Sequence, residues 1–375
     1  MQERLAYIVL NMIEGLGPVS VRRLIDCLGS PRAILEAGCE ELMKARGVGE
    51  KLAFKIITQR DSLDAEAEID KAAELGVRLI TPMDTEYPEA LKAIHDPPLA
   101  LYVRGRLIPE DAKALAIVGS RSTSQYGLKA ADRFAFQLGQ TGFTVVSGLA
   151  RGTDTAAHRG ALKGNGRTVA VLGGAIDRLY PPENAELAEK IAAQGAVISE
   201  YPLGRQADRM TFPYRNRIIS GLSMGVLLIE SDLKGGSMHT ADAAMEQGRT
   251  VFALPGRIDT PGAKGPHFLI KNGARLVQSL DDILEEYELL IPPEELEMPE
   301  AATAARPDVP LSEQERNVVE ALWQEPLDVD TLARAVGIAS HELSGLLLGL
   351  EMKRVVRTLP GKVVELADDL RTGKF

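Results

Sequence analysis

The chain has 375 residues, 45% of them hydrophobic, and this length suggests two or three domains with a substantial core. Its formal net charge of −10 is unusual for a nucleic-acid binder. A local basic face can still bind phosphate, because salt screens charges beyond about 8 Å. No stretch reaches the roughly 18 apolar residues of a membrane span. Cys27 and Cys39 have no metal- or redox-type spacing, so we expect free thiols and a soluble, cytoplasmic protein without a metal or cofactor.

Residues 1–65 are expected to form a helical domain of the SAM or helix-hairpin-helix type. Gly15-Leu16-Gly17 precedes one expected helix, 18–28, and Gly47-Val48-Gly49 precedes another, 50–59. The glycines of such hairpins allow a positive φ and let backbone N–H groups approach a phosphate. Neither hairpin is followed by a dense basic cluster, so a small interaction bundle with plain turns remains the alternative.

Between about residues 70 and 290, apolar runs alternate with helical stretches of 10 to 15 residues. Several runs, such as ALAIVG and TVAVLGG, are apolar throughout, which indicates strands buried on both faces of a mostly parallel sheet. We therefore predict a doubly wound, Rossmann-like α/β domain. The predicted strands are Val77–Thr81, Leu99–Val103, Ala114–Val118, Phe143–Ser147, Thr168–Leu172, Ala196–Ser199, Gly225–Glu230, Thr250–Leu254 and Arg275–Val277.

A segment rich in Pro, Ala and Glu, 291–310, is predicted to be a linker to a C-terminal domain, 311–375. That domain shows the winged-helix pattern of three helices and a hairpin. The expected elements are helices over 312–323, 329–335 and 339–351 and strands over 355–358 and 362–366. Ser312 and Glu315 form a capping-box pattern. The third helix contains no Arg or Lys, which argues against reading of the DNA major groove.

Four central strands run into polar, glycine-rich turns. In an open α/β sheet such turns meet at the carboxyl edge of the strands, where glycines and helix N-termini expose backbone N–H groups. We predict that these turns hold phosphates; a purely structural set of tight turns is the alternative. The candidate residues are Gly119, Ser120, Arg121, Ser147, Gly148, Arg151, Gly152, Lys234, Gly235, Gly236 and Ser237.

No catalytic constellation accompanies these turns. The sequence lacks GxxxxGK[ST], a GxGxxG after a strand, and a GxSxG elbow, which disfavours ATP hydrolysis, dinucleotide binding and serine hydrolysis. Four carboxylates have no paired base or metal, so we expect them to orient loops and to accept bonds from arginines: Asp154, Asp177, Glu200 and Glu230. His158 is expected to be a structural or loop-bonding histidine.

The segment FPYRNRIISG, 212–221, is the most distinctive in the chain. It places Phe212 and Tyr214 beside two arginines and an asparagine. An exposed aromatic ring next to cations is typical of a site that stacks bases and follows the backbone of an unpaired strand. The alternative is that the two rings belong to the core. Four arginines lie nearby against the single acid Asp208: Arg205, Arg209, Arg215 and Arg217.

Long, correctly ordered motifs over residues 70–280 resemble the DNA-processing protein A family (DprA or Smf). They are GSR at 119–121, SGLARGTDTAAHRGAL at 147–162, TVAVLGGAIDRLYPPEN at 168–184, SEYP at 199–202, FPYRNRIISGLS at 212–223 and LKGGSMHTADAAMEQGRTVFALPG at 233–256. The flanking domains resemble versions of the family with a helical N-terminal domain and a winged helix. In one departure from the family, His267 stands where an asparagine is usual, and we assign it no role.

The resemblance implies a non-enzymatic protein that binds single-stranded DNA in a basic pocket of an extended Rossmann fold. It further implies protection of incoming DNA during natural transformation, loading of RecA, and a homodimer formed through the Rossmann-like domain. Carried over to this chain, the pocket uses Arg121, the Ser147–Gly152 loop, Arg209, Phe212, Arg215, Asn216, Arg217 and the Lys234–Ser237 turn.

Two other functions are kept as alternatives. A nucleoside monophosphate-processing enzyme is faintly echoed by KGGSMHTADAAMEQ with Glu246. A transcription regulator acting through the winged helix would prefer particular duplex sequences. Turnover of nucleoside monophosphates and duplex footprinting, respectively, distinguish these alternatives from binding of a single strand.

Overall fold

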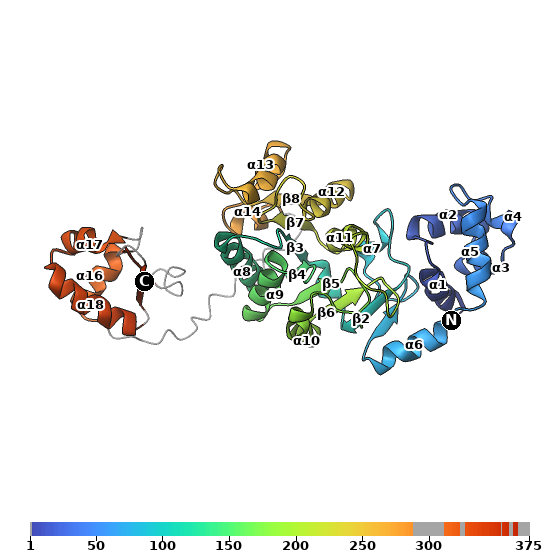
Figure 1. Ribbon diagram of the computed structural model, residues 1–375, viewed down its shortest axis with the longest axis horizontal. Helices are drawn as coiled ribbons and strands as arrows, with labels where there is room; N and C mark the ends of the chain where they lie inside the picture. Colours follow the sequence, from blue (N-terminus) through green and yellow to red (C-terminus); the bar gives the residue numbers. More distant parts are fainter. Residues whose placement is uncertain (1, 288–310, 323–326, 354, 360–362, 367–375) are drawn as a thin grey trace. The chain divides into compact units, whose positions relative to one another are not determined.

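The structure is a computed structural model (Figure 1). It describes residues 2–287, 311–322, 327–353, 355–359 and 363–366. The chain divides into two compact units, Met1–Pro299 and Glu300–Phe375. The predicted linker, 291–310, lies outside the described residues. None of the described helices is long and apolar enough to cross a membrane.

The centre of the first unit is a nine-stranded sheet with the order β1-β2-β6-β5-β4-β3-β7-β8-β9. The pairs β1–β2 and β2–β6 are antiparallel, and the other pairs are parallel. All nine predicted strands are confirmed, with ends shifted by at most two residues. Their bounds are β1 Arg78–Ile80, β2 Leu101–Gly105, β3 Ala114–Val118, β4 Thr144–Ser147, β5 Thr168–Val171, β6 Ala196–Ser199, β7 Gly225–Leu228, β8 Thr250–Ala253 and β9 Arg275–Leu276.

Strand β3 marks the point where the sheet reverses its direction of growth. From β3 the chain adds β4, β5 and β6 on one side, and later adds β7, β8 and β9 on the other. The loops after β3 and β7 therefore diverge to opposite faces of the sheet and leave a crevice at the carboxyl ends of the strands. The predicted doubly wound α/β fold is confirmed.

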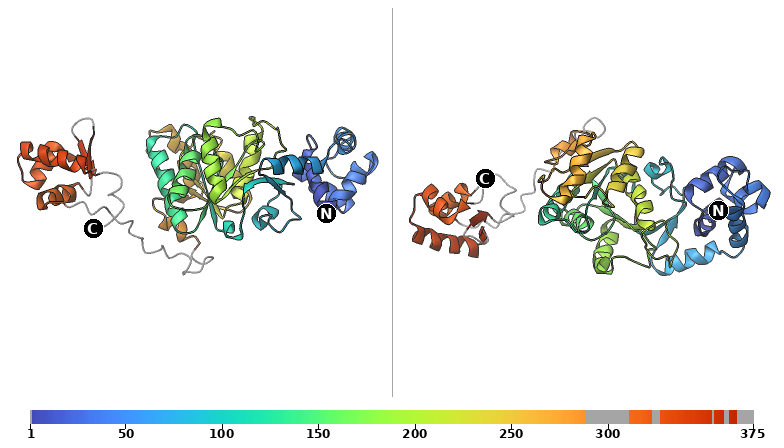
Figure 2. Two further views of the ribbon diagram at one scale, coloured as in Figure 1. Left: turned by 90° about the horizontal axis from the view of Figure 1, so that it is seen from below. Right: turned by 45° about the horizontal axis from the view of Figure 1, so that its top comes forward.

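Helices cover both faces of the sheet (Figure 2). One face packs against α8, α9, α10 and α14, and the other packs against α7, α11, α12 and α13. Helix α8 shows why: Ala131, Phe134, Ala135 and Leu138 recur at helical spacing and are fully buried. The bounds are α7 Glu89–Lys92, α8 Gln125–Gln140, α9 Thr153–Lys163, α10 Ala185–Gln194, α11 Thr211–Gly221, α12 Met238–Glu246, α13 Lys264–Lys271, α14 Asp281–Leu284, and the short 3₁₀ helices η1 Pro109–Ala112, η2 Pro182–Asn184 and η3 Pro261–Ala263.

The N-terminal part is helical, as predicted. Gly15 and Gly47 take positive φ values of 83° and 85°, and Gly17 and Gly49 are the N-caps of α2 and α5. The two Gly-apolar-Gly hairpins thus have the same local geometry. The helices are α1 Gln2–Met12, α2 Pro18–Leu28, α3 Pro31–Glu36, α4 Cys39–Leu42, α5 Glu50–Arg60 and α6 Ala65–Glu74.

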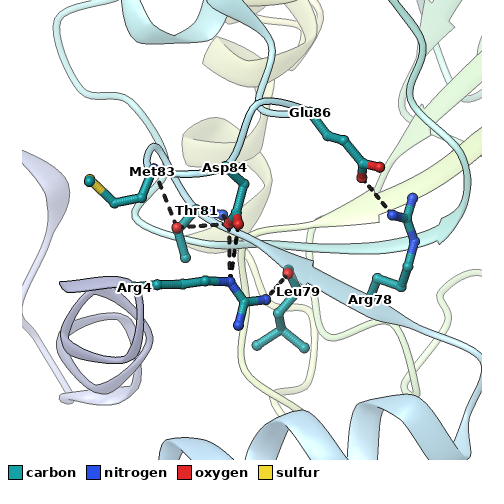
Figure 3. Close-up of polar contacts among 7 residues, drawn as sticks. All are labelled: Arg4, Arg78, Leu79, Thr81, Met83, Asp84 and Glu86. Atoms are coloured by element: carbon teal, nitrogen blue, oxygen red, sulfur yellow. Dashed lines mark hydrogen bonds and ion pairs between the residues drawn. The ribbon is translucent and has the colours of Figure 1, made fainter. Parts of the chain in front are cut away.

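Hydrogen bonds and apolar contacts join helix α1 to the antiparallel edge of the sheet. Arg4 donates to both carboxylate oxygens of Asp84 at 3.2 Å and to the carbonyl of Leu79 at 2.7 Å (Figure 3). Asp84 also accepts bonds from the backbone N–H and the hydroxyl of Thr81. Ile8 of α1 belongs to the same buried cluster as Tyr102 of β2. The helical part and the central sheet therefore share apolar and polar contacts.

The second unit is a winged helix, as predicted. Ser312 and Glu315 form the predicted capping box, with N–H···O distances of 2.8 and 3.3 Å. A strand that the sequence analysis did not predict, β10, joins the hairpin in the order β10-β12-β11. The bounds are α16 Glu313–Ala321, β10 Leu327–Asp328, α17 Val329–Val336, α18 Ser340–Met352, β11 Val356–Leu359 and β12 Val363–Leu366.

Candidate nucleic-acid interface

A cleft of about 460 Å³ opens at the carboxyl ends of β3 and β7, where the crevice of the sheet is expected. The turns after β3, β4 and β7 and the first turns of α11 and α12 form its walls. The lining residues are Val118, Gly119, Ser120, Arg121, Ser122, Ala150, Asp154, Arg209, Phe212, Pro213, Arg215, Asn216, Ile219, Ser231, Asp232, Gly235, Gly236, Ser237, His239 and Thr240.

Arg121 and Phe212 form a cation–aromatic pair at this cleft. The exposed Arg121 guanidinium lies 4.6 Å from the centroid of the Phe212 ring. Phe212 is half-buried, and its ring packs so closely on Gly173 that a Cβ there would approach the ring to 2.7 Å. Phe212 is therefore a fixed ring at the cleft wall. Tyr214 has 58% of its surface exposed, so the alternative that its ring belongs to the core is wrong.

Arg215 supplies a buried cation in the wall of the cleft. It is only 4% exposed, and its guanidinium donates to the carbonyls of Gly148, at 2.6 Å, and Val171. Burial lowers the pKa of Arg215 to about 10, while the nearby Asp154 carboxylate favours the charged form. Arg215 therefore remains a cation at neutral pH. Gly148 permits this approach, because a Cβ at that position would collide with the guanidinium.

Two helix N-termini border the cleft. Helix α12 follows the Gly235-Gly236-Ser237 turn, and the hydroxyl of its N-cap, Ser237, bonds to the Ser231 hydroxyl at 2.9 Å rather than to the backbone of the helix. Its first N–H groups and the partial positive charge of the helix end favour an anion. Helix α9 starts after Gly152, which has a φ of 73° and lies too close to the Ser120 carbonyl to carry a Cβ. The glycines of both turns thus serve tight backbone geometry next to the cleft.

Ten of the sixteen predicted site residues line the cleft. They are Gly119, Ser120, Arg121, Arg209, Phe212, Arg215, Asn216, Gly235, Gly236 and Ser237. Gly148 and Arg151 line a smaller hollow of about 30 Å³ beside it. Gly152 shapes the turn, and Lys234 is exposed in the turn before α12. The remaining two, Ser147 and Arg217, are placed differently.

The side chains of Ser147 and Arg217 are used inside the protein, which corrects their assignment as DNA contacts. Ser147 is fully buried, and its hydroxyl donates to the carbonyl of Ile117 at 2.7 Å, between neighbouring strands. Arg217 has 8% of its side chain exposed and pairs with Glu200 at 2.5 Å and with Asp96 at 2.9 Å. The physical reason is the same in both cases: a buried polar group requires an internal partner.

The carboxylates of the domain orient loops and accept bonds, as predicted. Asp154 accepts bonds from the backbone N–H groups of Gly148 and Ala150 at 3.1 and 3.3 Å. Burial raises the pKa of Asp154, against the opposing effect of Arg215. Glu230 accepts bonds from the side chains and backbone that begin α8, and Asp177 accepts one from the backbone N–H of residue 204 at 2.9 Å. Glu200 takes part in the Arg217 ion pair.

His158, His267 and Glu246 do not line the cleft, whereas His239 does. His158 is fully buried with Nδ1 2.7 Å from the Thr168 hydroxyl, and burial lowers its pKa to about 3. It is therefore a neutral, structural residue at pH 7. His267 Nε2 lies 3.0 Å from the Gly256 carbonyl. Glu246 is exposed at the last turn of α12, whereas the first turn of that helix lines the cleft.

Sequence reasoning missed several residues that shape the site. Asn184 donates to the Leu149 carbonyl at 2.9 Å and to the Thr155 hydroxyl at 2.8 Å, which holds the turn after β4. Leu149 itself has a φ of 55°, rare for a side chain of this kind. The sequence signal for Asn184 is the YPPEN segment, 180–184, in which two prolines restrict the backbone shortly before the asparagine. Within the part of the chain that the structure describes, no group of three or more His, Cys, Asp or Glu is arranged to hold a metal.

Comparisons with known proteins assign the family. The family described as DNA recombination-mediator protein A matches residues 78–288, more than half of the chain. The chain belongs to this family. The flanking parts match the DprA winged helix domain, at residues 302–362, and the SAM-like helix-hairpin-helix tandem, at residues 7–60.

Similar members of the DNA recombination-mediator protein A family cover most of the chain. Protein Smf of Synechocystis sp. is 34% identical over 96% of this chain and 98% of its own length. Protein Smf of Escherichia coli is 42% identical over 76% of this chain and 77% of its own length. The DNA processing protein DprA of Bacillus subtilis is 40% identical over 57% of this chain and 72% of its own length.

Two solved structures of family members resemble the fold. The X-ray structure of DprA from Streptococcus pneumoniae has a TM-score of 0.67 and 33% identity. The match covers 76% of this chain and 98% of the Streptococcus pneumoniae chain. DNA processing protein A from Helicobacter pylori, solved to describe its single-stranded DNA binding mode, has a TM-score of 0.50 and 28% identity over 56% of this chain and 94% of its own. Membership in this family supports a DNA-processing, recombination role.

Proposed function

We propose that the cleft between the turns after β3 and β7 binds single-stranded DNA. The observation that carries the proposal is the Arg121–Phe212 pair, in which an exposed cation lies 4.6 Å from a fixed aromatic ring at the cleft wall. A base can stack on the ring when the Arg121 guanidinium moves off its face to contact the adjoining phosphate. Such stacking is worth about 1–3 kcal/mol per base.

The geometry favours an unpaired strand over a duplex. In a duplex the bases are already stacked, so the Phe212 ring has no base face to contact. Arg215 lies in the cleft wall with 4% exposure, and its guanidinium is bonded to the carbonyls of Gly148 and Val171. It therefore adds a fixed positive charge behind the wall rather than a direct phosphate contact. The binding-mode structure of the Helicobacter pylori relative supports the same substrate for this chain.

The same reasoning reconciles DNA binding with the acidic composition. Three arginines, Arg121, Arg209 and Arg215, line the cleft, together with the N-terminus of α12. By contrast, nine acidic residues and no basic one occur in the segment 281–300 of the sequence. Because salt screens distant charge beyond about 8 Å, the local cations decide the attraction of a phosphate.

For the cellular role, we infer a recombination mediator of natural transformation that acts in the cytoplasm. Bound single strand would be protected from nucleases and handed to RecA, and the protein would act as a homodimer through its Rossmann-like domain. The family assignment supports a recombination role of this kind. Loading of RecA onto a single strand covered by a single-strand binding protein, with and without this protein, tests the inference.

The binding proposal is tested by replacing Arg121. We expect Arg121→Ala to weaken binding of a labelled dT20 oligonucleotide in fluorescence anisotropy. The slope of log K against log salt should also fall by about 0.7, the value for one phosphate contact on a single strand.

The control for this measurement is Arg133→Ala. Arg133 is exposed on α8 and lies 5.2 Å from the centroid of Phe134, so it is a similar cation–aromatic pair on another helix. We expect the affinity of Arg133→Ala for dT20 and its salt slope to match those of the wild type. Equal salt slopes for Arg121→Ala and the wild type would contradict the assignment of the cleft.

A further inference from the structure

A smaller hollow adjoins the cleft at Phe212. It is lined by Arg151 and Tyr180, and it shares Arg121, Ala150 and Phe212 with the cleft. The two hollows are therefore continuous around one aromatic ring. A strand that stacks a base on Phe212 would have to leave the cleft past this point.

Two neighbouring rings lie between two cations along this path. The Arg121 guanidinium lies 4.6 Å from the Phe212 centroid, and the Phe212 and Tyr180 centroids lie 6.1 Å apart with their planes tilted by 51°. The Arg151 guanidinium lies 6.0 Å from the Tyr180 centroid. Tyr180 is 46% exposed, so part of its ring is open to a ligand.

The backbone holds Tyr180 in place beside the turn after β4. Pro181, the next residue, is buried, and the 3₁₀ turn η2 follows directly. Asn184 at the end of η2 bonds to the Leu149 carbonyl at 2.9 Å. This bond ties the Tyr180 loop to the loop that carries Arg151, so the second ring is preorganised for binding.

We propose that Tyr180 and Arg151 form a second nucleotide subsite, in which the base next to the one on Phe212 stacks on Tyr180 and Arg151 contacts the phosphate. This inference rests on the proposed binding of single-stranded DNA. The ring centroids lie 6.1 Å apart and the ring planes are tilted by 51°, so bases stacked on the two rings cannot lie parallel at the rise of about 3.4 Å found in a duplex strand. The two subsites therefore hold consecutive bases separated from each other, which only an unpaired strand permits.

Glu183 sets the strength of this subsite. Its carboxylate pairs with Arg151, and both side chains are about half exposed. The bond from Arg151 holds the pKa of Glu183 below its usual range, so the acid is charged at neutral pH. Exposed ion pairs of this kind contribute little stability, so a phosphate can displace Glu183 from Arg151. Replacing Glu183 by an uncharged side chain removes the cost of that displacement.

The experiment measures binding of labelled dT20 to the full-length protein and its variants by fluorescence anisotropy. Tyr180→Ala is expected to weaken binding about tenfold, within the range that loss of one stacked base produces. Tyr180→Phe keeps the ring and should bind within twofold of the wild type. Glu183→Gln should bind more tightly, because Arg151 is released for the phosphate. Tyr126→Ala removes another exposed tyrosine, on α8, and should change nothing.

The outcomes separate this subsite from the cleft. If Phe212→Ala weakens binding and Tyr180→Ala does not, the second subsite is wrong and the cleft proposal stands. If neither variant changes the affinity, the cleft proposal itself fails. Should Tyr180→Ala not fold, Glu183→Gln and Tyr180→Phe carry the test: unchanged affinity in Glu183→Gln would overturn the role of Arg151.

Discussion

Close approaches that only glycine permits shape the cleft residue by residue. A Cβ at Gly148 would collide with the Arg215 guanidinium, and one at Gly173 would lie 2.7 Å from the Phe212 ring. Neither glycine has a positive φ, so the requirement is for space rather than for backbone freedom. These two positions hold the buried cation and the stacking ring where they are.

Gly173→Ala is therefore expected to weaken binding of single-stranded DNA while the protein still folds. The added methyl group displaces the half-buried Phe212 ring, which can move toward solvent at moderate cost. Anisotropy with dT20 measures the affinity, and urea denaturation measures the free energy of unfolding.

Gly345→Ala is the matched control for this variant. Gly345 lies on α18 in the winged helix, where a Cβ would meet no atom within 4 Å. Its affinity should equal that of the wild type. If Gly173→Ala also bound dT20 as tightly as the wild type, the position of the Phe212 ring would not matter for binding.

The sequence predicted the position of a site residue best where that position follows from the order of the strands. Arg121 lies in the turn after β3, so its place at the carboxyl edge follows from the topology of the sheet. Ser147 is the last residue of β4, and its hydroxyl turns inward to Ile117. Whether a strand-end side chain points out or in depends on a neighbouring strand, and the sequence does not show that neighbour.

At the scale of elements, α11 explains both the success and the error over FPYRNR. Arg215, Ile218, Ile219 and Leu222 recur at helical spacing and are buried, while Tyr214 is exposed. This periodicity could have placed Arg215 on the inner face of the helix. Burial of Arg217 depends on Asp96 and Glu200, which come from distant segments, and local periodicity cannot reveal such partners.

Arg217→Met is expected to lower the free energy of unfolding by about 3 kcal/mol or more, because it leaves Glu200 buried without its partner. Urea denaturation measures the loss. Affinity for dT20 in the folded fraction should stay close to that of the wild type, because the Arg217 side chain does not line the cleft.

Arg257→Met is the control, since it breaks the ion pair of Arg257 with Asp259, in which both side chains are well exposed. Little change in stability is expected there. An Arg217→Met protein with wild-type stability and no affinity for single strands would show that Arg217 is a DNA contact after all.

The strands were the most predictable elements. Strands such as β3 and β7 are buried on both faces, so their apolar runs mark them in the sequence without any alternating pattern. The winged-helix strand β10 has two residues, too few for a pattern, and only pairing with β12 defines it.

At the scale of the whole molecule, the net charge is a poor guide to what the cleft binds. The cations that matter come from segments more than ninety residues apart, Arg121 after β3 and Arg215 on α11. The doubly wound topology brings them together at the reversal of the sheet. The sequence predicted this convergence through the order of strands and helices, but it could not show that α1 is bonded to the sheet edge through Arg4 and Asp84.

The most direct test of the central claim is to map where a single strand contacts the full-length protein. A dT20 oligonucleotide carrying photoreactive 5-iodouracil would be cross-linked by light, and the attached peptides identified by mass spectrometry. We expect cross-links in the peptides that contain Phe212 and Tyr180. Cross-links confined to the N-terminal helices or to the winged helix would contradict it.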